Sequence, residues 1–505
     1  MRRSRARGCP RCARLVREQR RLRKRITRLE GLLEEARRSA KRQAAPFSRG
    51  DPARRPRPPG RRPGAAYGRP VHRPVPAHVD EVLEALLPHA CPVCGGAVEV
   101  QGMADQYQTE VPVVRPTVVR FRIPLGRCQR CGHRVQGRHP RQTSNALGAA
   151  ASQLGPRAIA LAADLNKGLG LPYGKVQAIF DRHFGIAVSR GGLCLALHRL
   201  ARRGQSTYHQ LVAVVRSSPV VSPDETGWKV GGRLNWLWAF ATPTATVYAI
   251  LPGRGYEEAA GILAPTFAGT LVRDGWAPYR KFTQAQHQSC LAHLLRRCRE
   301  MIETAERGAA RFPHAVRRLL LAALAVRERA ARGDISAHGL RVAKGQLQAR
   351  LSRLLGGRIM HPPNQTFVKH LRHEAPHLLT FLGRDEVPAT NFRAEQALRP
   401  AVVTRKVWGG NRTWHGARTQ QVLASILRTW RQRGQDPTPF FQGVLCSPER
   451  QRCGLAPPGP GPPRPPTTAP AGLYSSSGQR KEEGHGLGCE GAVDRLGHGA
   501  IHQTA

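Results

Sequence analysis

The stretch from residue 218 to residue 306 constrains the fold more than any other part of this chain of 505 residues. Three runs rich in β-branched and aromatic residues follow one another, VVSPDETGWKV, RLNWLWAFAT and ATVYAILPG, and Gly-Gly and Thr-Pro-Thr turns separate them. A short helix (YEEAAGILA), a strand (GTLVRDG) and a helix from about Gln284 to Glu306 come next. Three meandering strands followed by alternating helices and strands predict a mixed α/β domain.

Three acidic residues stand at informative places in this pattern. Asp224 follows the first β-rich run, Asp274 ends the strand GTLVRD, and Glu395 lies on a helix that begins near Asn391. If that helix packs beside the strand ends, the three carboxylates meet and can hold two Mg²⁺ ions about 3.5–4 Å apart. Paired cations of this kind serve phosphodiester cleavage and strand transfer. Taken singly, each acid could be a surface or capping residue, and for Glu395 alone that is the favoured interpretation, because exposed acids are the rule.

Two neighbours of Asp224 complicate the prediction. Glu225 faces the opposite side of an extended strand, so the sequence leaves open which of the two carboxylates points inward. Pro223 directly precedes Asp224 and cannot donate a hydrogen bond to a neighbouring strand. That loss is tolerable at a strand end, but inside a strand it could displace Asp224.

The charge of the chain indicates its partner. The formal net charge is +48, which favours binding to nucleic acid over binding to a membrane surface. We find no run of about 20 apolar residues that could span a membrane, and the Arg-rich start lacks the apolar core of a signal peptide. The order of strands and helices is what a nuclease core of the ribonuclease-H type requires. We therefore expect a soluble, cytoplasmic protein with a nuclease-like core.

Two Cys-x-x-Cys pairs predict a zinc site. Cys91 and Cys94 form one pair, Cys128 and Cys131 the other, and the strand-like sequences QYQTEVPVV and TVVRFRIPL lie between them. Four thiolates on two hairpin turns suit a tetrahedral structural Zn²⁺; the alternative is unpaired surface cysteines. The CPRC at 9–12 has no second pair nearby, so a metal there would need a second chain or a distant histidine.

Composition and periodicity divide the rest of the chain. Residues 9–45 carry leucines at heptad spacing, which fits a coiled coil or a single amphipathic helix. Residues 46–80 form a Pro/Arg-rich linker, residues 81–140 the zinc-ribbon-like module, and residues 446–505 a disordered tail. Residues 145–205 are helical, with Ser189 as a candidate N-cap, and form either a helix-turn-helix or a plain helical support.

Four blocks of this sequence resemble the signature blocks of the IS66-family transposases, which are DDE transposases of bacterial insertion sequences. The blocks are DETGWKVGGRLNWLWAFATPTATVYAI, LVRDGWAPYRKF, HQSCLAHLLRRCRE and ATNFRAEQALRPAVVTRKVWGGNRT, and the resemblance covers roughly residues 10–436. It implies that Asp224, Asp274 and Glu395 are the metal-binding catalytic triad. It also implies a catalytic domain at 215–432 with an all-α insertion at about 294–388.

The full expectation is a multidomain α/β protein. Its parts are a ribonuclease-H-like mixed-sheet core with an all-α insertion, an N-terminal coiled-coil helix and a zinc-ribbon-like β module. The resemblance implies that the chain acts on DNA, namely terminal inverted repeats and target DNA, with two Mg²⁺ ions (or Mn²⁺) and a structural Zn²⁺. A homo-oligomer, accessory proteins encoded by the element, and a bacterial, nucleoid-associated location are expected. The rivals are a decayed transposase that only binds DNA and a structure-specific nuclease.

The remaining candidate residues fall in two of these blocks. Cys290 and His293 match the C-x-x-H string that many DDE transposases carry, and at this spacing they share a helix face. Two ligands are too few for a closed zinc site, so a packing or positioning role is the prediction, although His287 and Cys298 keep metal binding open. The block that contains TRKVWGGNRT offers cations, backbone donors and an aromatic ring for contact with DNA. The alternative is a turn that connects two helices and carries solvated charges. The candidate residues are Arg405, Lys406, Trp408, Asn411 and Arg412.

Overall fold

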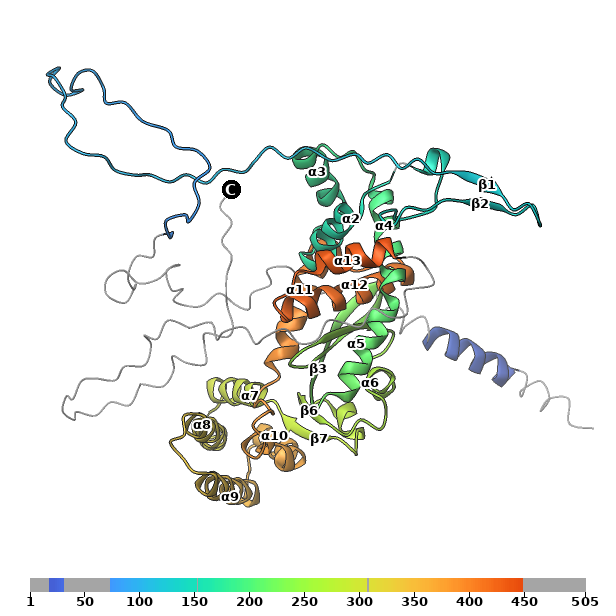
Figure 1. Ribbon diagram of the computed structural model, residues 1–505. Coiled ribbons are helices and arrows are strands. Elements are labelled where there is room, and N and C mark those ends of the chain that lie inside the picture. Colours follow the sequence, from blue (N-terminus) through green and yellow to red (C-terminus); the bar gives the residue numbers. More distant parts are fainter. Residues whose placement is uncertain (1–17, 31–72, 152, 307, 448–505) are drawn as a thin grey trace, which may run out of the picture. The chain divides into compact units, whose positions relative to one another are not determined.

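The computed structural model describes residues 18–30, 73–151, 153–306 and 308–447, and a mixed five-stranded sheet lies at its centre (Figure 1). The strand order is β5-β4-β3-β6-β7. Strands β3, β4 and β5 form an antiparallel meander, while β6 pairs in parallel with both β3 and β7. The mixed α/β fold expected from the sequence is confirmed. The strands are β3 Val220–Val230, β4 Arg233–Ala241, β5 Thr246–Leu251, β6 Thr270–Arg273 and β7 Gln286–Ser289.

Helices cover both faces of the sheet. One face shares a large apolar core with α2, α4, α5, α6, α12 and α13, in which Trp238 and Phe240 are fully buried. The opposite face carries α11, whose alanines pack on Trp228 and Leu237. The helices are α2 Pro156–Ala163, α3 Tyr173–Phe184, α4 Arg190–Arg203, α5 Gln205–Ser217, α6 Tyr256–Leu263, α11 Phe392–Trp408, α12 Trp414–Gln432 and α13 Pro437–Cys446.

Helix α12 closes the edge of the sheet at β5. An edge strand presents unpaired backbone groups, which invite pairing with another chain unless something covers them. Here side chains of α12 accept from three alternate N–H groups of β5: Thr429 at 3.1 Å from Thr246, Ser425 at 2.8 Å from Tyr248, and Gln421 at 3.2 Å from Ile250. Polar side chains on the buried face of α12 therefore replace a sixth strand.

Four long helices separate β7 from α11 in the sequence. They are α7 Leu291–Glu303, α8 Arg311–Ala331, α9 Ala337–Gly356 and α10 Pro362–Glu374. They build an apolar core of their own around Phe312, Leu320 and Phe367, and Val220 and Val272 of the sheet join it. The helical interval expected near 294–388 is thus present and is packed against the central strands.

One predicted element was wrong at its start. The helix expected from Gln284 begins only at Leu291, and Gln286–Ser289 forms the fifth strand instead. This strand does not alternate apolar and polar residues, because its buried side chains are polar. Groups in the helical segment form hydrogen bonds with Gln288. The side-chain amide of Gln288 donates to the Leu378 carbonyl at 3.2 Å and accepts from the Phe381 N–H at 2.9 Å.

The strands expected between the cysteine pairs are also absent. Residues 97–123 are described and contain no strand; only the short β1 Leu125–Arg127 and β2 Arg134–Gln136 pair nearby. One proline interrupts each of the two strand-like sequences and a third, Pro116, lies between them. Val113 and Val118 are 91% and 90% exposed. Residues of high β-propensity do not form a strand without a partner and a face to bury.

The leucine-patterned segment is described only in part. Residues 18–30 are helical, and Leu22, Ile26 and Leu29 are each roughly half exposed. The rest of the 9–45 prediction, the linker at 46–72 and the tail from 448 lie outside the described residues. Pairing of this helix with a second copy stays a prediction.

Helices α3 and α4 occupy the segment considered for a helix-turn-helix. Ser189 caps α4 as predicted, because its hydroxyl accepts from the Gly192 N–H at 3.0 Å. Helix α4 buries Leu193, Leu197 and Leu200 in the main core, which gives it a supporting role whatever else it contacts. No helix within the described ranges has the length and apolar character needed to cross a membrane.

Candidate active site

Asp224 lies in the central strand β3 and faces α11. It stands opposite Ala239 of β4, which belongs to the apolar cluster under α11. One carboxylate oxygen accepts from the Glu225 N–H at 2.9 Å. The pKa of Asp224 is raised to about 8, mainly by burial and in part by the negative charges of Glu225, Asp274 and Glu395, against the lowering effect of the Glu225 N–H. Asp274 and Glu395 thus act electrostatically on Asp224, whereas the ligand oxygens of the three described acids do not all lie within 4.8 Å of one another.

Glu225 points to the other face of the sheet. Its carboxylate accepts from Arg254 Nε at 2.5 Å and from the Tyr279 hydroxyl at 2.6 Å. These two partners occupy both oxygens, and the side chain is almost fully buried. The question that the sequence left open is thus answered, because Asp224 faces Glu395 whereas Glu225 is held in the opposite layer.

Pro223 sits inside β3 and not at its end, yet it breaks no pairing. Parallel pairing with β6 stops at Val221, so the backbone of Pro223 lies beyond that ladder. Its carbonyl accepts from the side-chain amide of Asn391 at 2.9 Å. Asn391 directly precedes α11, and this bond therefore joins the start of that helix to the residue before Asp224.

Asp274 comes from the strand next to β3, and Glu395 from the helix that packs on the face of the sheet to which Asp224 points. Asp274 directly follows β6, and one of its oxygens accepts from the Trp276 N–H at 2.9 Å. Glu395 lies in the first turn of α11, where the positive end of the helix dipole favours a carboxylate. Carboxylate oxygens are the ligand type that a hard divalent cation such as Mg²⁺ prefers, and Glu395 also lies 3.6 Å from Nε2 of His293.

The tightest set of metal-binding atoms is a different one. Among the residues that the structure describes, Cys290, His293 and Glu395 form the set of three whose ligand atoms all lie within 4.8 Å of one another. Cys290 is at the junction of β7 and α7, and His293 lies in the first turn of α7. Of the two extra ligands kept open from the sequence, His287 bonds to Arg273 and the Phe282 carbonyl, and Cys298 is buried in the helical core.

A buried charge cluster next to Asp274 escaped the sequence analysis. Arg273 and Glu374 are both fully buried and form an ion pair at 2.6 Å. Glu374 comes from α10 and also accepts from the Ser289 hydroxyl at 2.6 Å and from Arg280 at 3.0 Å. Burial alone would raise the pKa of Glu374, but Arg273, Ser289 and Arg280 bring it below its usual value. Since Arg273 also donates to the Asp274 carbonyl at 2.9 Å, the cluster fixes the backbone at the candidate site.

A cavity of about 270 Å³ opens beside this cluster. Asp274, Cys290, His293 and Glu374 are among the residues that line it. It therefore connects the second candidate acid with the Cys290, His293 and Glu395 set.

The two cysteine pairs each form a turn suited to metal binding. In each pair the first cysteine donates its N–H to a carbonyl five residues on, and a glycine with positive φ (Gly95 at 73°, Gly132 at 67°) completes the turn. Backbone N–H groups of Val93 and Cys94 lower the pKa of Cys91, and those of Cys131 and Arg130 lower the pKa of Cys128. Such donors stabilise thiolates, so each pair fits half of a zinc site. Among the described residues, the four sulfurs do not lie within 4.8 Å of one another.

Arg405, Trp408 and Asn411, which the sequence predicted to contact DNA, have partners inside the protein. Arg405 donates to the Thr226 hydroxyl at 2.5 Å and to the Gly227 carbonyl at 2.6 Å. The Lys167 ammonium lies 4.9 Å from the centre of the Trp408 ring. Asn411 is buried, and its side chain accepts from the Trp228 indole N–H at 2.8 Å.

The same block continues the sheet through backbone contacts. The Asn411 N–H donates to the Lys229 carbonyl at 2.8 Å, and its carbonyl accepts from the Gly231 N–H at 2.9 Å. These bonds favour the interpretation that the block is a turn that connects α11 to α12. Contact with DNA through Lys406 and the exposed Arg412 stays a prediction.

The geometry of this turn gives a matched pair of variants. Gly409 and Gly410 both have positive φ, at 79° and 114°, but only at Gly410 would a Cβ meet a backbone atom, the Lys229 carbonyl oxygen at 2.3 Å. We expect Gly409→Ala to cost roughly 1–2 kcal/mol, the usual penalty of the left-handed conformation, and Gly410→Ala to cost clearly more. Thermal unfolding of both variants measures the difference, and equal melting temperatures would contradict the close approach.

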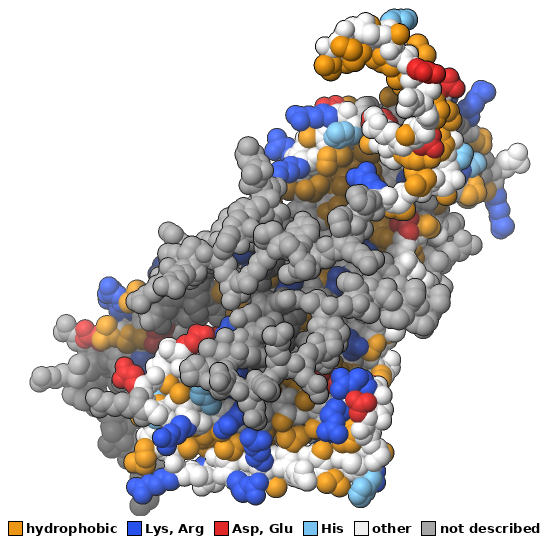
Figure 2. All heavy atoms as spheres, turned by 90° about the vertical axis from the view of Figure 1, so that its left-hand side faces the viewer, with side chains coloured by type: hydrophobic (Ala, Val, Ile, Leu, Met, Phe, Trp, Pro, Cys, Tyr) orange, Lys and Arg blue, Asp and Glu red, His pale blue; other side chains and the backbone are white. Residues whose placement is uncertain are grey.

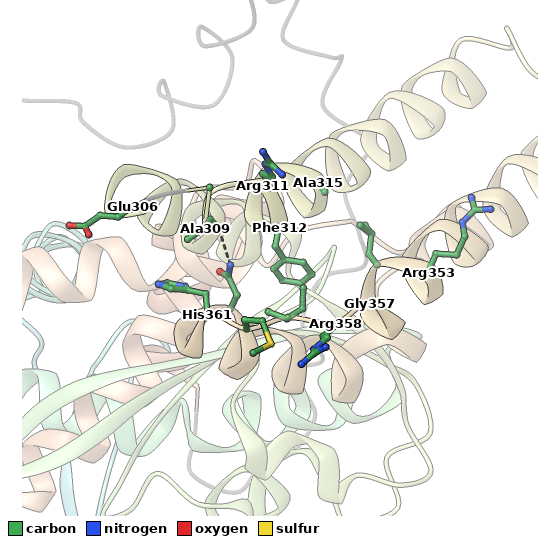
Figure 3. Close-up of a pocket in the computed structure, with 14 residues that line it drawn as sticks. Glu306, Ala309, Arg311, Phe312, Ala315, Arg353, Gly357, Arg358 and His361 are labelled. Atoms are coloured by element: carbon green, nitrogen blue, oxygen red, sulfur yellow. Dashed lines mark hydrogen bonds between the residues drawn. The ribbon is translucent and has the colours of Figure 1, made fainter.

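A second hollow, of about 690 Å³, lies within the helical segment (Figure 3). The start of α8, the end of α9 and the start of α10 line it, and Asn364 donates to the Ala309 carbonyl across one side at 2.8 Å. Phe312 lies at its base, whereas Arg311, Arg353 and Arg358 are exposed around it. Basic side chains also outnumber acidic ones on the part of the surface that Figure 2 shows, where Lys and Arg are frequent and Asp and Glu are sparse.

Comparison with known proteins gives a family match over the region just described. The model of the family described as "Transposase IS66 family" matches residues 151–419, which include the three acids and helices α7 to α10. Two similar curated proteins come from Sinorhizobium fredii (strain NBRC 101917 / NGR234), and both carry the description "uncharacterized". Protein y4jD is 27% identical over 304 residues, which are 53% of this chain and 58% of y4jD. Protein y4qI is 24% identical over 425 residues, 75% of this chain and 76% of y4qI.

Proposed function

This chain belongs to the IS66 family of transposases, since that family's model matches more than half of it, and on this premise we propose that it cuts and joins DNA at the ends of an insertion sequence. The proposed active site consists of Asp224, Asp274 and Glu395, working with two Mg²⁺ or Mn²⁺ ions. The observation that carries the proposal is the placement of these acids: Asp224 on β3 faces α11, which carries Glu395, and Asp274 directly follows β6, the parallel neighbour of β3.

The sheet supports the proposal through the places it gives these residues. An antiparallel meander extended by two parallel strands, in the order β5-β4-β3-β6-β7, is the arrangement we ascribe to a ribonuclease-H-like core. Asp224 then stands on the central strand, Asp274 at the carboxyl end of its parallel neighbour and Glu395 on the helix that covers them. Rigid elements thus hold all three donors, as a precise metal site requires.

The proposed reaction has two steps of in-line displacement at phosphorus. In the first, the oxygen of a water molecule bonds to phosphorus and the water gives up a proton. The bond between phosphorus and the 3′-oxygen breaks, and the 3′-oxygen takes up a proton. In the second, the freed 3′-hydroxyl loses its proton, its oxygen bonds to a target phosphorus, and the displaced target oxygen takes up a proton. Bound divalent cations would supply stabilisation of the attacking and leaving oxygens. Asp224, Asp274 and Glu395 would hold these cations and fix their position relative to the DNA backbone.

Other parts of the chain would hold the DNA. The exposed arginines around the hollow in the helical segment, Arg311, Arg353 and Arg358, suit phosphate groups without sequence preference. The two cysteine pairs would bind a structural Zn²⁺ and present the module at 81–140 to a terminal repeat. Because transposition bridges two ends of an element, the proposal includes a homo-oligomer.

One assay separates this function from its rivals. A labelled duplex that carries the element's terminal repeat, incubated with the full chain and Mg²⁺, is expected to be nicked and then joined to a target plasmid. A decayed transposase would bind the duplex without nicking it. A structure-specific nuclease would cut branched or RNA-containing substrates equally well without the repeat and would join nothing. Inverted repeats flanking the coding region would supply the natural substrate for this assay.

A further inference from the structure

We propose that Cys290, His293 and Glu395 form a binding site for a thiophilic divalent cation of the Zn²⁺ class. The site shares Glu395 with the proposed Mg²⁺ site but adds a sulfur and a nitrogen ligand. Its existence rests on geometry alone, whereas its effect on strand cleavage rests on the proposed function.

The three ligand atoms are close enough for one ion. They lie within 4.8 Å of one another, and Nε2 of His293 lies 3.6 Å from a Glu395 oxygen. A tetrahedral zinc with ligands at about 2.0–2.3 Å would need them roughly 3.3–3.8 Å apart. Small side-chain rotations therefore bring the set to bonding distance, without movement of α7 or α11.

Burial raises the pKa of the Cys290 thiol, and backbone N–H donors beside the sulfur act against that shift. Cys290 directly precedes α7, so its sulfur lies at the positive end of that helix. The Asn391 N–H, at the start of α11, points at the sulfur from 3.2 Å. Two helix starts thus converge on one buried sulfur, and such N–H donors commonly accompany metal-bound thiolates.

His293 has no hydrogen bond that would account for its position. Its Nδ1 atom is buried and has no partner among the described residues, and the 3.6 Å from Nε2 to Glu395 is longer than a hydrogen bond. Buried polar atoms normally have a partner, and an orphan calls for an unobserved one. An imidazole held beside a thiol and a carboxylate is best completed by a cation.

The ligand types and the cavity indicate which ion binds and how. Thiolate and imidazole ligands select Zn²⁺ over Mg²⁺, which prefers oxygen ligands only. Three protein ligands leave a fourth position open, and the cavity of about 270 Å³ that Cys290 and His293 line also contains Asp274. Zinc bound here would draw the Glu395 carboxylate away from Asp224, so excess Zn²⁺ is expected to inhibit Mg²⁺-dependent strand cleavage.

Zinc counting on the full-length chain tests the site directly. Each variant is saturated with Zn²⁺, dialysed and measured by mass spectrometry of the metal, with circular dichroism to establish folding. Cys290→Ser and His293→Gln are each expected to lose one zinc equivalent relative to the unchanged protein. Cys298→Ala is the matched control, because it removes another buried thiol of α7 that lies in the apolar core. In Co²⁺-substituted protein, the same two variants are expected to lose one set of thiolate-to-cobalt absorption bands.

The outcomes are decisive for this site independently of the proposed function. His293 is partly exposed, so His293→Gln decides the matter if Cys290→Ser fails to fold. An unchanged zinc count in folded His293→Gln would overturn the proposal. Asp224→Asn, which leaves all three ligands in place, is expected to keep the full count. Absence of strand cleavage by the unchanged protein would remove the proposed function but leave these zinc counts standing.

Discussion

Replacing Asp224 with asparagine is expected to lower the rate of Mg²⁺-dependent strand cleavage by about three orders of magnitude, because several kcal/mol of charge stabilisation disappear with the carboxylate. Binding to DNA ends should remain nearly unchanged, since Asp224 faces α11 and the other acids and not a basic surface. Asparagine keeps an oxygen for the Glu225 N–H, so the local backbone is preserved. Single-turnover nicking and a gel-shift assay measure the two properties separately.

The same variant should not be less stable in the absence of metal. Burial and three neighbouring negative charges disfavour the Asp224 carboxylate, and the neutral amide removes that repulsion. Asp385→Asn is the control, because this aspartate is exposed and pairs with Arg327 at the surface of the helical segment, away from the candidate site. Retained cleavage in Asp224→Asn, or an equal loss in Asp385→Asn, would contradict the assignment of the site.

The central strands could be predicted from sequence because local patterns specify them. The run that contains Asp224 has the bounds of β3, Val220–Val230, and Asp274 follows β6 as expected. β-branched and aromatic residues bounded by turn residues carry enough information when the strand has a partner and a core. The strand-like residues 106–114 have neither, which explains why the same propensity failed there.

The polar contacts between distant segments could not be predicted. Glu374 lies 101 residues from Arg273, and no local pattern indicates that a helix of the interval 294–388 delivers a carboxylate to a buried arginine. The fifth strand was missed for the same reason, since its buried Gln288 and Ser289 look like loop residues until their partners are known. Asn391 is a third example of a long-range contact that the sequence does not reveal. Its bond to the Pro223 carbonyl holds the residue before Asp224 in place, although the sequence suggested that Pro223 could displace Asp224.

The block around Trp408 shows that residue type alone does not reveal which side chains have partners inside the protein. Cations, an aromatic ring and glycines suit DNA contact, yet Arg405 and Asn411 bind the strand β3 and its tryptophan. A sequence cannot state whether a cation faces solvent or a neighbouring carbonyl. What could have warned of this is the pair of glycines, since a close backbone approach commonly requires glycine.

The buried pair of Arg273 and Glu374 supports the second large prediction. Both side chains have no exposed surface, and Glu374 also bonds Ser289 and Arg280. Glu374→Gln keeps the shape but leaves the Arg273 guanidinium without a counter-charge, and breaking such a buried pair costs about 3–5 kcal/mol of unfolding free energy. Asp385→Asn removes the exposed partner of Arg327 and is expected to cost less than about 1 kcal/mol. Urea unfolding at neutral pH measures the free energy of unfolding of the unchanged protein and the two variants. Similar losses in both variants would show that the buried pair contributes no more to stability than the exposed one.

The pH dependence provides an independent check on the same pair. The pKa of Glu374 is lowered in the folded protein, so its contribution to stability is present above the unfolded-state pKa near 4.3 and disappears as the pH falls through the lower folded-state value. The gap in unfolding free energy between Glu374→Gln and the unchanged protein should therefore narrow only in acid, below about pH 4. Because Arg273 also donates to the Asp274 carbonyl, strand cleavage by Glu374→Gln should fall under conditions where the variant is still folded. Full cleavage activity in folded Glu374→Gln would mean that the helical segment anchors the sheet without positioning Asp274.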